Sequence, residues 1–385
     1  MTNEKQKKDT GFVHTQEGLN APYYALTPPI FRATTYHQAD PWNPPPYDYA
    51  RSGNPTRAAL EEALAGLEQG VRGFAFSSGM AALTAAFMLF SAGDHLIVTR
   101  DCQGGTQRVL RGVFQRFGIE VNYVDTDNLS AVNDALRPNT KAVLVENFSN
   151  PFLRVTDIAQ VASWAKSRGL LTLVDNTFLT PYLQQPLTLG ADLVIHSATK
   201  MLSGHSDVTA GVAVARDAEL AKRLYFIQNA CGMALSPDDS YQVLRGIRTL
   251  PLRMERAQAS AQTLASALTR LPEVVQVYYP GFPDHPGHDI AVLSIGGFGA
   301  MVTFRLQDPA WVQTMAKNFR FTMVGAGFGG TETIVSLPEL HCHAALLQEE
   351  RAQREITSDL VRVSVGMENP DDIVQEFVRA IKRSH

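Results

Sequence analysis

Two segments decide the fold: LLTLVDNTF at residues 170–178 and DLVIHSATK at residues 192–200. Each contains a short, mostly apolar run, Leu170–Val174 or Leu193–Ile195, and ends on polar side chains. Such a run, without strict polar alternation, is typical of a strand buried on both faces in a parallel sheet covered by helices. The two segments therefore predict buried strands whose polar residues lie at the carboxyl edge of the sheet.

Outward from these segments, strand and helix patterns alternate from residue 57 to about residue 240. This order predicts an α/β fold with a mostly parallel sheet flanked by helices. Further strands are predicted at Gly73–Phe76, His95–Thr99, Ile119–Val124 and Ala142–Val145, and helices at Met80–Phe90, Thr106–Phe117, Leu129–Leu136 and Ile158–Arg168.

The rest of the chain predicts a second unit. A long helical pattern, Ser240–Leu271 with an interruption at Pro251, leads into mixed strands and helices. We expect an N-terminal arm at residues 1–56, a large α/β domain at residues 57–245 and a smaller C-terminal α/β domain at residues 246–385.

The arm has a composition of its own, with prolines between aromatic residues such as Tyr24, Tyr36 and Trp42. Proline fixes φ and removes a backbone donor, so the arm is predicted to be mostly extended. Because it is too apolar to remain free in water, we expect it to pack on its own body or on a neighbouring subunit.

Composition excludes several classes of protein. The 385 residues include 38 acidic and 34 basic ones, and 45% are hydrophobic, which fits neither a disordered chain nor a basic nucleic-acid binder. Three widely spaced cysteines predict free thiols and a reducing, cytoplasmic compartment. The longest apolar stretch, Met80–Phe90, is far short of the ~20 residues that span a bilayer. We therefore expect neither a nucleic-acid nor a membrane partner.

Lys200 follows its strand directly, in the segment Ser197-Ala198-Thr199-Lys200. Burial lowers the pKa of a lysine and makes its amine a nucleophile able to form a Schiff base. The hydroxyls of Ser197 and Thr199 suit phosphate binding. The alternative interpretation is a surface lysine at the end of a strand.

Asp175 lies at the end of the other strand, where open α/β sheets bind their ligands. A carboxylate there can hold a proton on a heterocyclic nitrogen, or it can cap the next turn. The segment Ser77–Met80 begins a helix whose first backbone N–H groups form an anion site, unless it is only an N-cap with a glycine turn.

Tyr49 and Arg51 stand two residues apart at the end of the arm. In an extended chain both side chains point to one face, so both can reach one phosphate. An amine nucleophile, a partner for a ring nitrogen and donors for a phosphate are together what pyridoxal 5′-phosphate requires. The sequence therefore predicts this cofactor and no metal.

The chain also resembles the Cys/Met-metabolism family of pyridoxal-phosphate enzymes, which includes cystathionine γ-synthase, cystathionine β- and γ-lyases and methionine γ-lyase. The resemblance implies a fold-type-I architecture, and elimination or replacement at Cβ or Cγ of an amino acid, with sulfur amino acids of the cystathionine type as substrates. It also implies a homotetramer made of two active dimers. It rests on motifs in the family's order: YARSGNPTR (49–57), SSGMAA (77–82), VDNTF (174–178), SATKMLSGHSD (197–207) and VRVSVGMEN (361–369).

Residue roles follow from the same resemblance. Lys200 is implied as the catalytic residue, and Tyr49 and Arg51 as donors to the cofactor phosphate of a neighbouring subunit. Arg362 is implied to hold the substrate carboxylate, with Asp48 and Gly327 also near the substrate. Cofactor binding as a whole is implied for Tyr49, Arg51, Gly79, Met80, Gln103, Asn150, Asp175, Thr177, Ser197 and Thr199.

Three positions depart from the family pattern. Gln103 replaces a tyrosine that stacks on the cofactor ring, and glutamine has neither an aromatic face nor a useful pKa. Phe148 lies in ENFSNP (146–151), where the family has Glu-Thr-Pro-Thr-Asn-Pro, and Gly327 replaces a serine. These departures indicate γ-replacement on a non-standard substrate as an alternative. A low-turnover cofactor-binding regulatory protein and an aminotransferase are also left open.

Two further patterns resemble ligand-binding motifs, but we interpret both as structural. The segment GAGFGG (325–330) matches a dinucleotide fingerprint, but it does not begin a β-α-β unit. His341, Cys342 and His343, together with His285 and His288, lack the carboxylate cluster that would complete a metal shell. We expect these histidines to be surface or loop residues.

Overall fold

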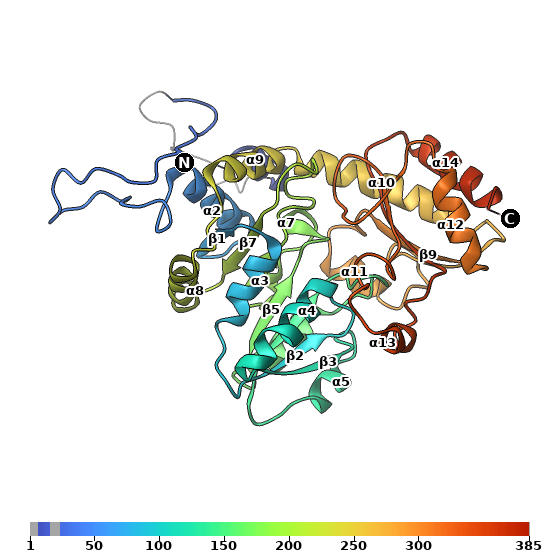
Figure 1. The fold of residues 1–385 in the computed structure, drawn as a ribbon, viewed down its shortest axis with the longest axis horizontal. Helices are drawn as coiled ribbons and strands as arrows, with labels where there is room; N and C mark the ends of the chain where they lie inside the picture. The colour runs from blue at the N-terminus through green and yellow to red at the C-terminus, as the bar shows by residue number, and fades with distance from the viewer. Residues whose placement is uncertain (1–6, 16–23, 385) are drawn as a thin grey trace.

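The computed structural model describes residues 7–15 and 24–384, and Figure 1 shows two α/β units side by side, joined by the long helix α10 (Leu250–Leu268). Residues 1–6 and 16–23 of the predicted arm, and residue 385, lie outside the described residues.

The larger unit is built on a seven-stranded sheet in the order β1-β7-β6-β5-β4-β2-β3. Five of these strands run parallel from β3 to β6, which confirms the predicted α/β fold with a mostly parallel sheet. The strands are β1 (Arg72–Phe76), β2 (His95–Thr99), β3 (Glu120–Val124), β4 (Thr140–Glu146), β5 (Leu171–Asp175), β6 (Leu193–His196) and β7 (Gly211–Ala215).

Strand β7 is the one that the sequence pattern does not predict. It is antiparallel to both β6 and β1, and it follows β6 without an intervening helix. The alternation of strand and helix is therefore broken at this point, and the short run GVAVA goes unrecognised.

Helices cover both faces of this sheet. Val174 and Val194 pack into the core under α2 and α6, whereas Leu173 and Ile195 pack into the core under α3, α4 and α8. This two-sided burial explains why the strands lack polar alternation. The helices are α2 (Pro55–Glu68), α3 (Gly79–Phe87), α4 (Gly104–Gly112), α5 (Leu129–Asp134), α6 (Ile158–Lys166), α7 (Thr180–Leu183), α8 (Ala218–Cys231) and α9 (Pro237–Ile247), with 3₁₀ turns at Phe114–Phe117 and Pro186–Leu189.

The smaller unit has a five-stranded sheet in the order β10-β11-β12-β9-β8. Helices α10 and α14 contribute Leu264, Leu268, Ile373 and Phe377 to its core. The strands are β8 (Val274–Tyr278), β9 (Met301–Leu306), β10 (Met323–Val324), β11 (Ile334–Ser336) and β12 (Leu360–Ser364), and the helices are α11 (His288–Ser294), α12 (Pro309–Asn318), α13 (Gln348–Gln353) and α14 (Pro370–Lys382).

The helical pattern between the two units is interrupted earlier than predicted. Helix α9 ends at Ile247 and α10 begins at Leu250, so the break lies before Pro251, which occupies the first turn of α10. Proline suits a first turn because the missing N–H has no intrahelical acceptor there. We propose residues 57–245 and 246–385 as the limits of the large and the small domain.

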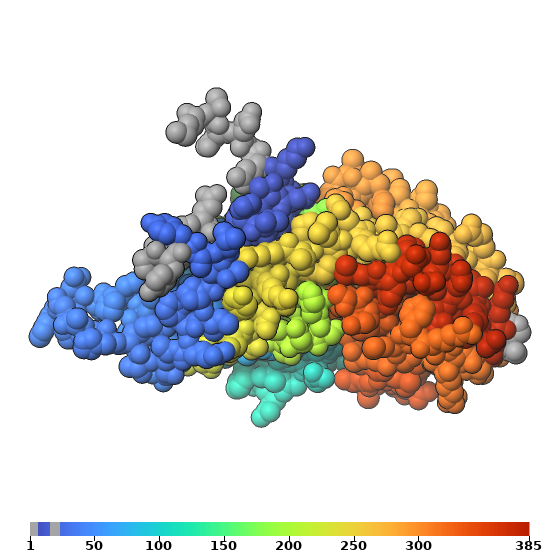
Figure 2. All heavy atoms as spheres, turned by 90° about the horizontal axis from the view of Figure 1, so that it is seen from above, coloured from blue at the N-terminus to red at the C-terminus, as the bar shows by residue number. Residues whose placement is uncertain are grey.

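The arm is not wholly extended. Helix α1 (Lys8–Val13) buries Phe12, whose ring packs edge-on against Tyr182 of the body at 5.7 Å. From residue 24 onward the arm is mostly extended and projects beyond the body, as the blue segment of Figure 2 shows. Leu26 and Trp42 are 91% and 92% exposed on this segment, so large apolar surface is left uncovered in the single chain.

No helix within residues 7–15 and 24–384 combines the length and the hydropathy that crossing a bilayer requires.

Candidate active site

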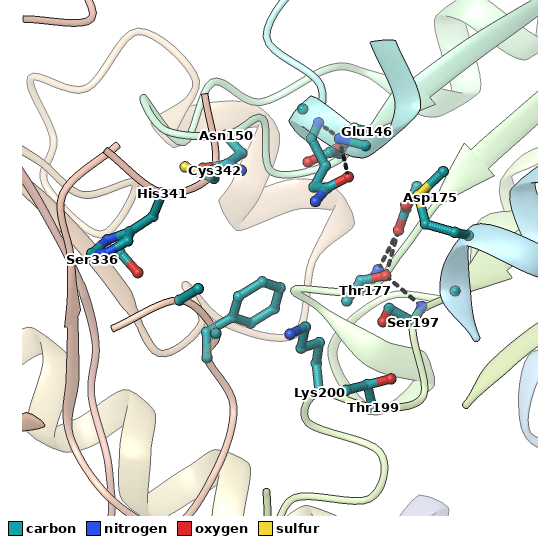
Figure 3. Close-up of a pocket in the computed structure, with 18 of the residues that line it drawn as sticks. Glu146, Asn150, Asp175, Thr177, Ser197, Thr199, Lys200, Ser336, His341 and Cys342 are labelled. Atoms are coloured by element: carbon teal, nitrogen blue, oxygen red, sulfur yellow. Dashed lines mark hydrogen bonds between the residues drawn. The ribbon is translucent and has the colours of Figure 1, made fainter. Parts of the chain in front are cut away.

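A cavity of about 610 Å³ opens at the carboxyl ends of β4, β5 and β6. The first turn of α3 forms another part of its wall, and Gly327 and Arg362 of the small domain line it as well. Figure 3 shows Asp175, Thr177 and Ser197 on one side of this cavity, with Lys200 and Thr199 below them. The strand ends that the sequence singles out therefore meet in one place.

Asp175 is buried at the end of β5 and receives two hydrogen bonds from Thr177. The backbone N–H and the hydroxyl of Thr177 donate to Asp175 Oδ1 at 3.0 and 2.5 Å. Burial raises the pKa of Asp175, whereas these two hydrogen bonds lower it. The Ser197 backbone N–H donates to Thr177 Oγ1 at 2.9 Å, so one threonine links the ends of β5 and β6.

Glu146 is a second buried carboxyl group beside Asp175. The two residues are register partners on the parallel strands β4 and β5, and both line the cavity. Burial, and next the charge of Asp175, hold the pKa of Glu146 well above its usual range. Glu146 therefore tends to keep its proton, while the donors from Thr177 favour the ionised form of Asp175. Glu146 Oε2 accepts the backbone N–H of Gln103 at 2.7 Å.

Lys200 follows β6, and its buried amine lies beside an aromatic ring. Its Nζ lies 4.8 Å from the centroid of the Phe328 ring, and the Arg362 guanidinium lies 5.3 Å from the same centroid. Burial, and next the charge of Arg362, lower the pKa of Lys200. Both causes favour the neutral amine that acts as a nucleophile.

The first turn of α3 has the features of an anion site. Ser78 caps the helix by accepting the Ala81 N–H at 3.0 Å, which leaves the first N–H groups, at Gly79 and Met80, without intrahelical acceptors. A Cβ at Gly79 would lie 2.7 Å from Ser197 Cβ, so only glycine fits here. The Thr199 hydroxyl donates to the carbonyl of Ala210 at 3.1 Å and accepts its N–H at 3.0 Å.

Arg362 is 2% exposed on β12 and faces the cavity. Its Nη1 donates to Asn150 Oδ1 at 2.7 Å, and its Nη2 donates to Ser336 Oγ at 3.2 Å. Its Nε is buried and has no hydrogen-bond partner among the described residues. Arg362 forms no ion pair with a described carboxylate, and a buried guanidinium with an unused donor is suited to a ligand carboxylate.

Comparison with known proteins identifies this arrangement. The profile of the Cys/Met metabolism PLP-dependent enzyme family matches residues 9–382. The chain belongs to this family. It is 46% identical to cystathionine β-lyase MetC of Bacillus subtilis over 382 residues, covering 99% of this chain and 98% of that protein. It is 44% identical to cystathionine γ-lyase of the same organism, covering 98% and 99%.

A solved family structure agrees with this assignment. Cystathionine γ-synthase from Xanthomonas oryzae pv. oryzae, in complex with cystathionine, superposes with a TM-score of 0.96 at 40% identity and 98% coverage of both chains. The chain is thus an enzyme of the carbon–sulfur lyase and transsulfuration type, and pyridoxal 5′-phosphate is its cofactor.

The residues present fit this cofactor. The cavity holds a buried amine at Lys200, an acid at Asp175 with two donors that favour its ionised form, and free N–H groups at the start of α3. The close contact between Gly79 and Ser197 brings the first N–H groups of α3 beside the Ser197 hydroxyl, and both kinds of donor suit a phosphate group. Three chemically different parts of the cofactor thus have matching partners in one cavity.

The structure brings most of the sequence-predicted site residues together. Eleven of the predicted site residues line this cavity: Gly79, Met80, Gln103, Asn150, Asp175, Thr177, Ser197, Thr199, Lys200, Gly327 and Arg362. Phe148, which departs from the family pattern, lines it as well. Gln103, Phe148 and Gly327 therefore depart from the family pattern at one common site. The Gln103 side chain caps α4, because its Oε1 accepts the Gly105 N–H at 2.7 Å.

Asp48, Tyr49 and Arg51 do not line this cavity in the single chain. Arg51 lies 5.7 Å from the centroid of the Tyr49 ring, and both line a separate depression beside Ser236. The carboxylate of Asp48 accepts the backbone N–H of Tyr49 at 2.6 Å.

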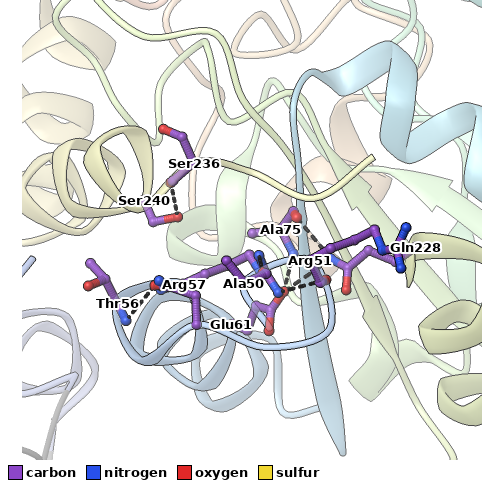
Figure 4. A network of polar contacts seen from close by, with 10 residues as sticks. Ala50, Arg51, Thr56, Arg57, Glu61, Ala75, Gln228, Ser236 and Ser240 are labelled. Atoms are coloured by element: carbon purple, nitrogen blue, oxygen red, sulfur yellow. Dashed lines mark hydrogen bonds and ion pairs between the residues drawn. The ribbon is translucent and has the colours of Figure 1, made fainter. Parts of the chain in front are cut away.

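The segment that carries Arg51 is held by a buried arginine. Arg57 donates to the carbonyls of Ala50 and Arg51 at 2.8 and 3.2 Å, and it pairs with Glu61, as Figure 4 shows. Glu61 in turn accepts the Ala75 N–H and the Gln228 side chain at 2.8 and 3.1 Å. The position of Arg51 is thus connected to the large domain through α2.

His341, Cys342 and His343 lie in a loop, as expected for the histidines, but this loop is only partly at the surface. His343 is fully buried, and its Nδ1 lies 3.1 Å from Cys342 Sγ. His341 and Cys342 line the cavity near Arg362. Tertiary packing of the small domain brings this segment over the sheet edge, which residue spacing does not reveal. Within the described residues, no group of three His, Cys, Asp or Glu could hold a metal ion.

Sequence reasoning also misses Glu146 and Arg108 as site residues. Glu146 stands at the end of a predicted strand that pairs with the strand of Asp175. The strand pattern could therefore have predicted that Glu146 lies at the same edge of the sheet. Arg108 is an exposed residue of α4 that lines the cavity and has no ion pair among the described residues. Nothing in its local sequence marks it.

Proposed function

We propose that the chain cleaves the carbon–sulfur bond of cystathionine by elimination. The observation that carries this proposal is the pair of guanidinium groups at one cavity, with Arg362 buried and Arg108 exposed. Cystathionine has a carboxylate at each end, and each arginine can bind one carboxylate. The similarity to cystathionine lyases supports the same substrate class.

Pyridoxal 5′-phosphate, when bound, supplies an electron-withdrawing ring that stabilises negative charge at the substrate Cα. The protein's own residues then have separate tasks. Lys200 holds the cofactor and moves the proton at Cα through its Nζ. Asp175 keeps a proton on the ring nitrogen by charge pairing. The N–H groups of Gly79 and Met80, with the Ser197 hydroxyl, hold the phosphate.

Arg362 orients the substrate by its α-carboxylate, and Asn150 and Ser336 fix the guanidinium. Phe328 excludes water between Lys200 and Arg362. Gln103 has no titratable group, so Lys200 is the main acid and base in our proposal.

Product analysis tests the proposal. Holoenzyme is incubated with L-cystathionine, and ammonia, pyruvate, 2-oxobutyrate and thiols are measured in parallel. Pyruvate with homocysteine indicates cleavage at Cβ, and 2-oxobutyrate with cysteine indicates cleavage at Cγ. Release of neither oxo acid, together with cystathionine formation from an O-acylhomoserine and cysteine, would assign γ-replacement instead.

Arg108→Ala tests the distal contact. We expect KM for cystathionine to rise, with a much smaller change for cysteine, which lacks the second carboxylate. An equal change for both substrates would contradict a distal role for Arg108. The matched control is Arg116→Ala, a neighbouring arginine that does not line the cavity.

We also propose that the protein is a homotetramer made of two active dimers, in which Tyr49 and Arg51 reach the phosphate site of the neighbouring subunit. The exposed Leu26 and Trp42 on the projecting arm support an intersubunit contact. The separation of Tyr49 from the cavity of its own chain supports it as well.

We further propose a cytoplasmic location. Its support is that the three cysteines, Cys102, Cys231 and Cys342, are all free thiols. Detection of the enzyme in a soluble, reducing cell fraction is the test.

A further inference from the structure

A second cavity, of about 590 Å³, lies between the two domains and shares no lining residue with the active site. Phe152 and Arg154 of the large domain line one side, and residues of β8 and the loop before α11 line the other. Its volume is nearly that of the active-site cavity, and it falls in the ordinary range for small-molecule sites. The proposed elimination reaction makes no use of it.

Aromatic and aliphatic side chains form part of the wall of this second cavity, beside polar and charged residues. Phe152 and Tyr278 pack edge-to-face with their centroids 5.3 Å apart, and Phe282 contributes a third ring. Val275 and Ile290 add aliphatic surface, and Val275 is 64% exposed at the rim. Such a lining suits an apolar side chain of a small molecule.

Charged groups of both signs stand around this apolar surface. Arg154 is half exposed and forms ion pairs with Asp101 and Asp127 at 3.5 Å in each case, so a ligand carboxylate at its exposed side competes with these two groups. Asp284 and Glu355 are exposed lining residues whose carboxylates attract an ammonium group. Together with the aromatic wall, this set matches an α-amino acid zwitterion with an apolar side chain.

One short turn connects this cavity to the active site. Ser149 and Arg154 close the turn, because the Ser149 N–H donates to the Arg154 carbonyl at 3.0 Å and the Arg154 N–H donates to Ser149 Oγ at 3.2 Å. Asn150 of the same turn lines the active site and accepts Arg362 Nη1 at 2.7 Å.

Asp101 ties the two ends of this turn together a second time. Its carboxylate pairs with Arg154, and its carbonyl accepts the Asn150 N–H at 2.9 Å. A carboxylate bound to Arg154 competes with Asp101 and thereby acts on the residue that fixes Arg362.

We propose that this cavity is an effector site for an α-amino acid with an apolar side chain. Its occupancy acts on substrate binding through the turn at residues 149–154. The inference goes beyond the proposed reaction, because it concerns a second ligand and does not depend on which bond is cleaved.

Binding is tested by calorimetry with L-phenylalanine, which has no sulfur leaving group. The holoenzyme carries Arg362→Met, so that the active site no longer holds a carboxylate and the heat reports the second site. We expect saturable binding of one molecule per chain. Adding Arg154→Met, which keeps an unbranched apolar side chain, should weaken binding about tenfold or more. Absence of saturable heat in Arg362→Met overturns the proposal.

A second variant distinguishes direct loss of ligand binding in the cavity from an indirect effect of Arg154→Met on the turn at residues 149–154. Val275→Trp fills the cavity from its exposed rim and leaves the turn unchanged, so its basal activity should equal that of the wild type. It should abolish phenylalanine binding in the Arg362→Met background. Undiminished binding in both Arg154→Met and Val275→Trp overturns the assignment of the site.

Coupling between the second cavity and the active site is tested by steady-state kinetics of the wild-type enzyme and of Val275→Trp, both with Arg362 intact. Phenylalanine should give mixed inhibition with a change in KM of about fivefold or more, in the range of ordinary coupling energies. In Val275→Trp only a competitive component should remain. The same inhibition pattern in both enzymes contradicts coupling through the turn.

Discussion

Among single residues, Lys200 has the environment that its chemistry requires. Its amine is buried near Phe328 and Arg362, and both burial and that positive charge lower its pKa. Asp175 and Glu146 are adjacent buried carboxyl groups, and burial raises the pKa of both, more strongly for Glu146, on which the charge of Asp175 also acts.

Lys200→Ala tests the attachment of the cofactor. After borohydride reduction of the holoenzyme, mass spectrometry should find the pyridoxyl group on the peptide with Lys200 in the wild type and on no peptide in the variant. Activity should fall by about 10²–10⁴-fold, as expected for loss of a general acid–base group. Lys222→Ala, an exposed lysine of α8, serves as the control. Pyridoxyl labelling elsewhere in the wild type would falsify the assignment.

Asp101 predicts a dependence of stability on pH. Burial raises its pKa to about 6, against the opposing charge of Arg154. The folded state therefore binds the proton more tightly than the unfolded state, whose aspartates titrate near ~4. Between these values, ionisation destabilises the folded state as the pH rises, and the full effect is present above the folded pKa.

The variant Asp101→Asn removes this titration. Relative to the wild type, its stability should rise on going from pH 4 to pH 7, by up to ~3 kcal/mol. Thermal and urea unfolding at a fixed protein concentration measure the difference. Asp134→Asn, in which the altered carboxylate is exposed, should show no such gain. An identical pH profile for wild type and Asp101→Asn would contradict the prediction.

At the scale of elements, the start of α3 is placed against the end of β6 by two small residues. Gly79 and Ser197 approach so closely that a Cβ on Gly79 would overlap Ser197. This contact brings the free N–H groups of a helix terminus to the strand that carries Lys200.

Gly79→Ala should therefore weaken cofactor binding. Overpacking of ~1–3 kcal/mol corresponds to a loss of affinity of about 10–100-fold. Titration of the apoenzyme with pyridoxal 5′-phosphate, followed by fluorescence quenching, measures it. Gly66→Ala is the matched control, because Gly66 lies inside α2 with nothing within 4 Å of the added Cβ. Equal affinity for pyridoxal 5′-phosphate in Gly79→Ala and Gly66→Ala would show that the first turn of α3 does not bind the phosphate.

For the whole molecule, the main observation is that Arg51, at the end of the N-terminal arm, does not reach the active-site cavity of its own chain. Arg51 is held by Arg57 in the large domain, yet it lies outside the cavity of Lys200. We propose that Arg51 contacts the phosphate site of a neighbouring subunit. This contact can be tested without knowing the structure of the oligomer.

Co-expression of two inactive variants provides the test. Arg51→Ala and Lys200→Ala should together recover about a quarter of the wild-type sites, because half of randomly mixed dimers are mixed and each then has one intact site. The control pair is Arg362→Ala with Lys200→Ala, whose residues line the same cavity of one chain and should not complement. Equal recovery in both pairs, or in neither, would refute the shared site.

The alternation of apolar runs and helical spacings is enough to predict the parallel strands and most of the helices. It does not predict β7, because an antiparallel strand without a crossover helix breaks the alternation. Nor does it predict helix α1 inside an arm rich in proline, where burial of Phe12 against Tyr182 provides the driving force.

The sequence by itself determined the fold class, the family and the chemistry of the strand ends, because buried strands and their polar termini are encoded in local order. Asp175, Lys200 and Gly79 belong to this set. Only the tertiary structure decided which distant residues join them. Arg362 meets Asn150, and His341 and Cys342 reach the same cavity, because the small domain packs over the sheet edge. Contacts between segments far apart in the chain depend on packing, and local spacing carries no record of them.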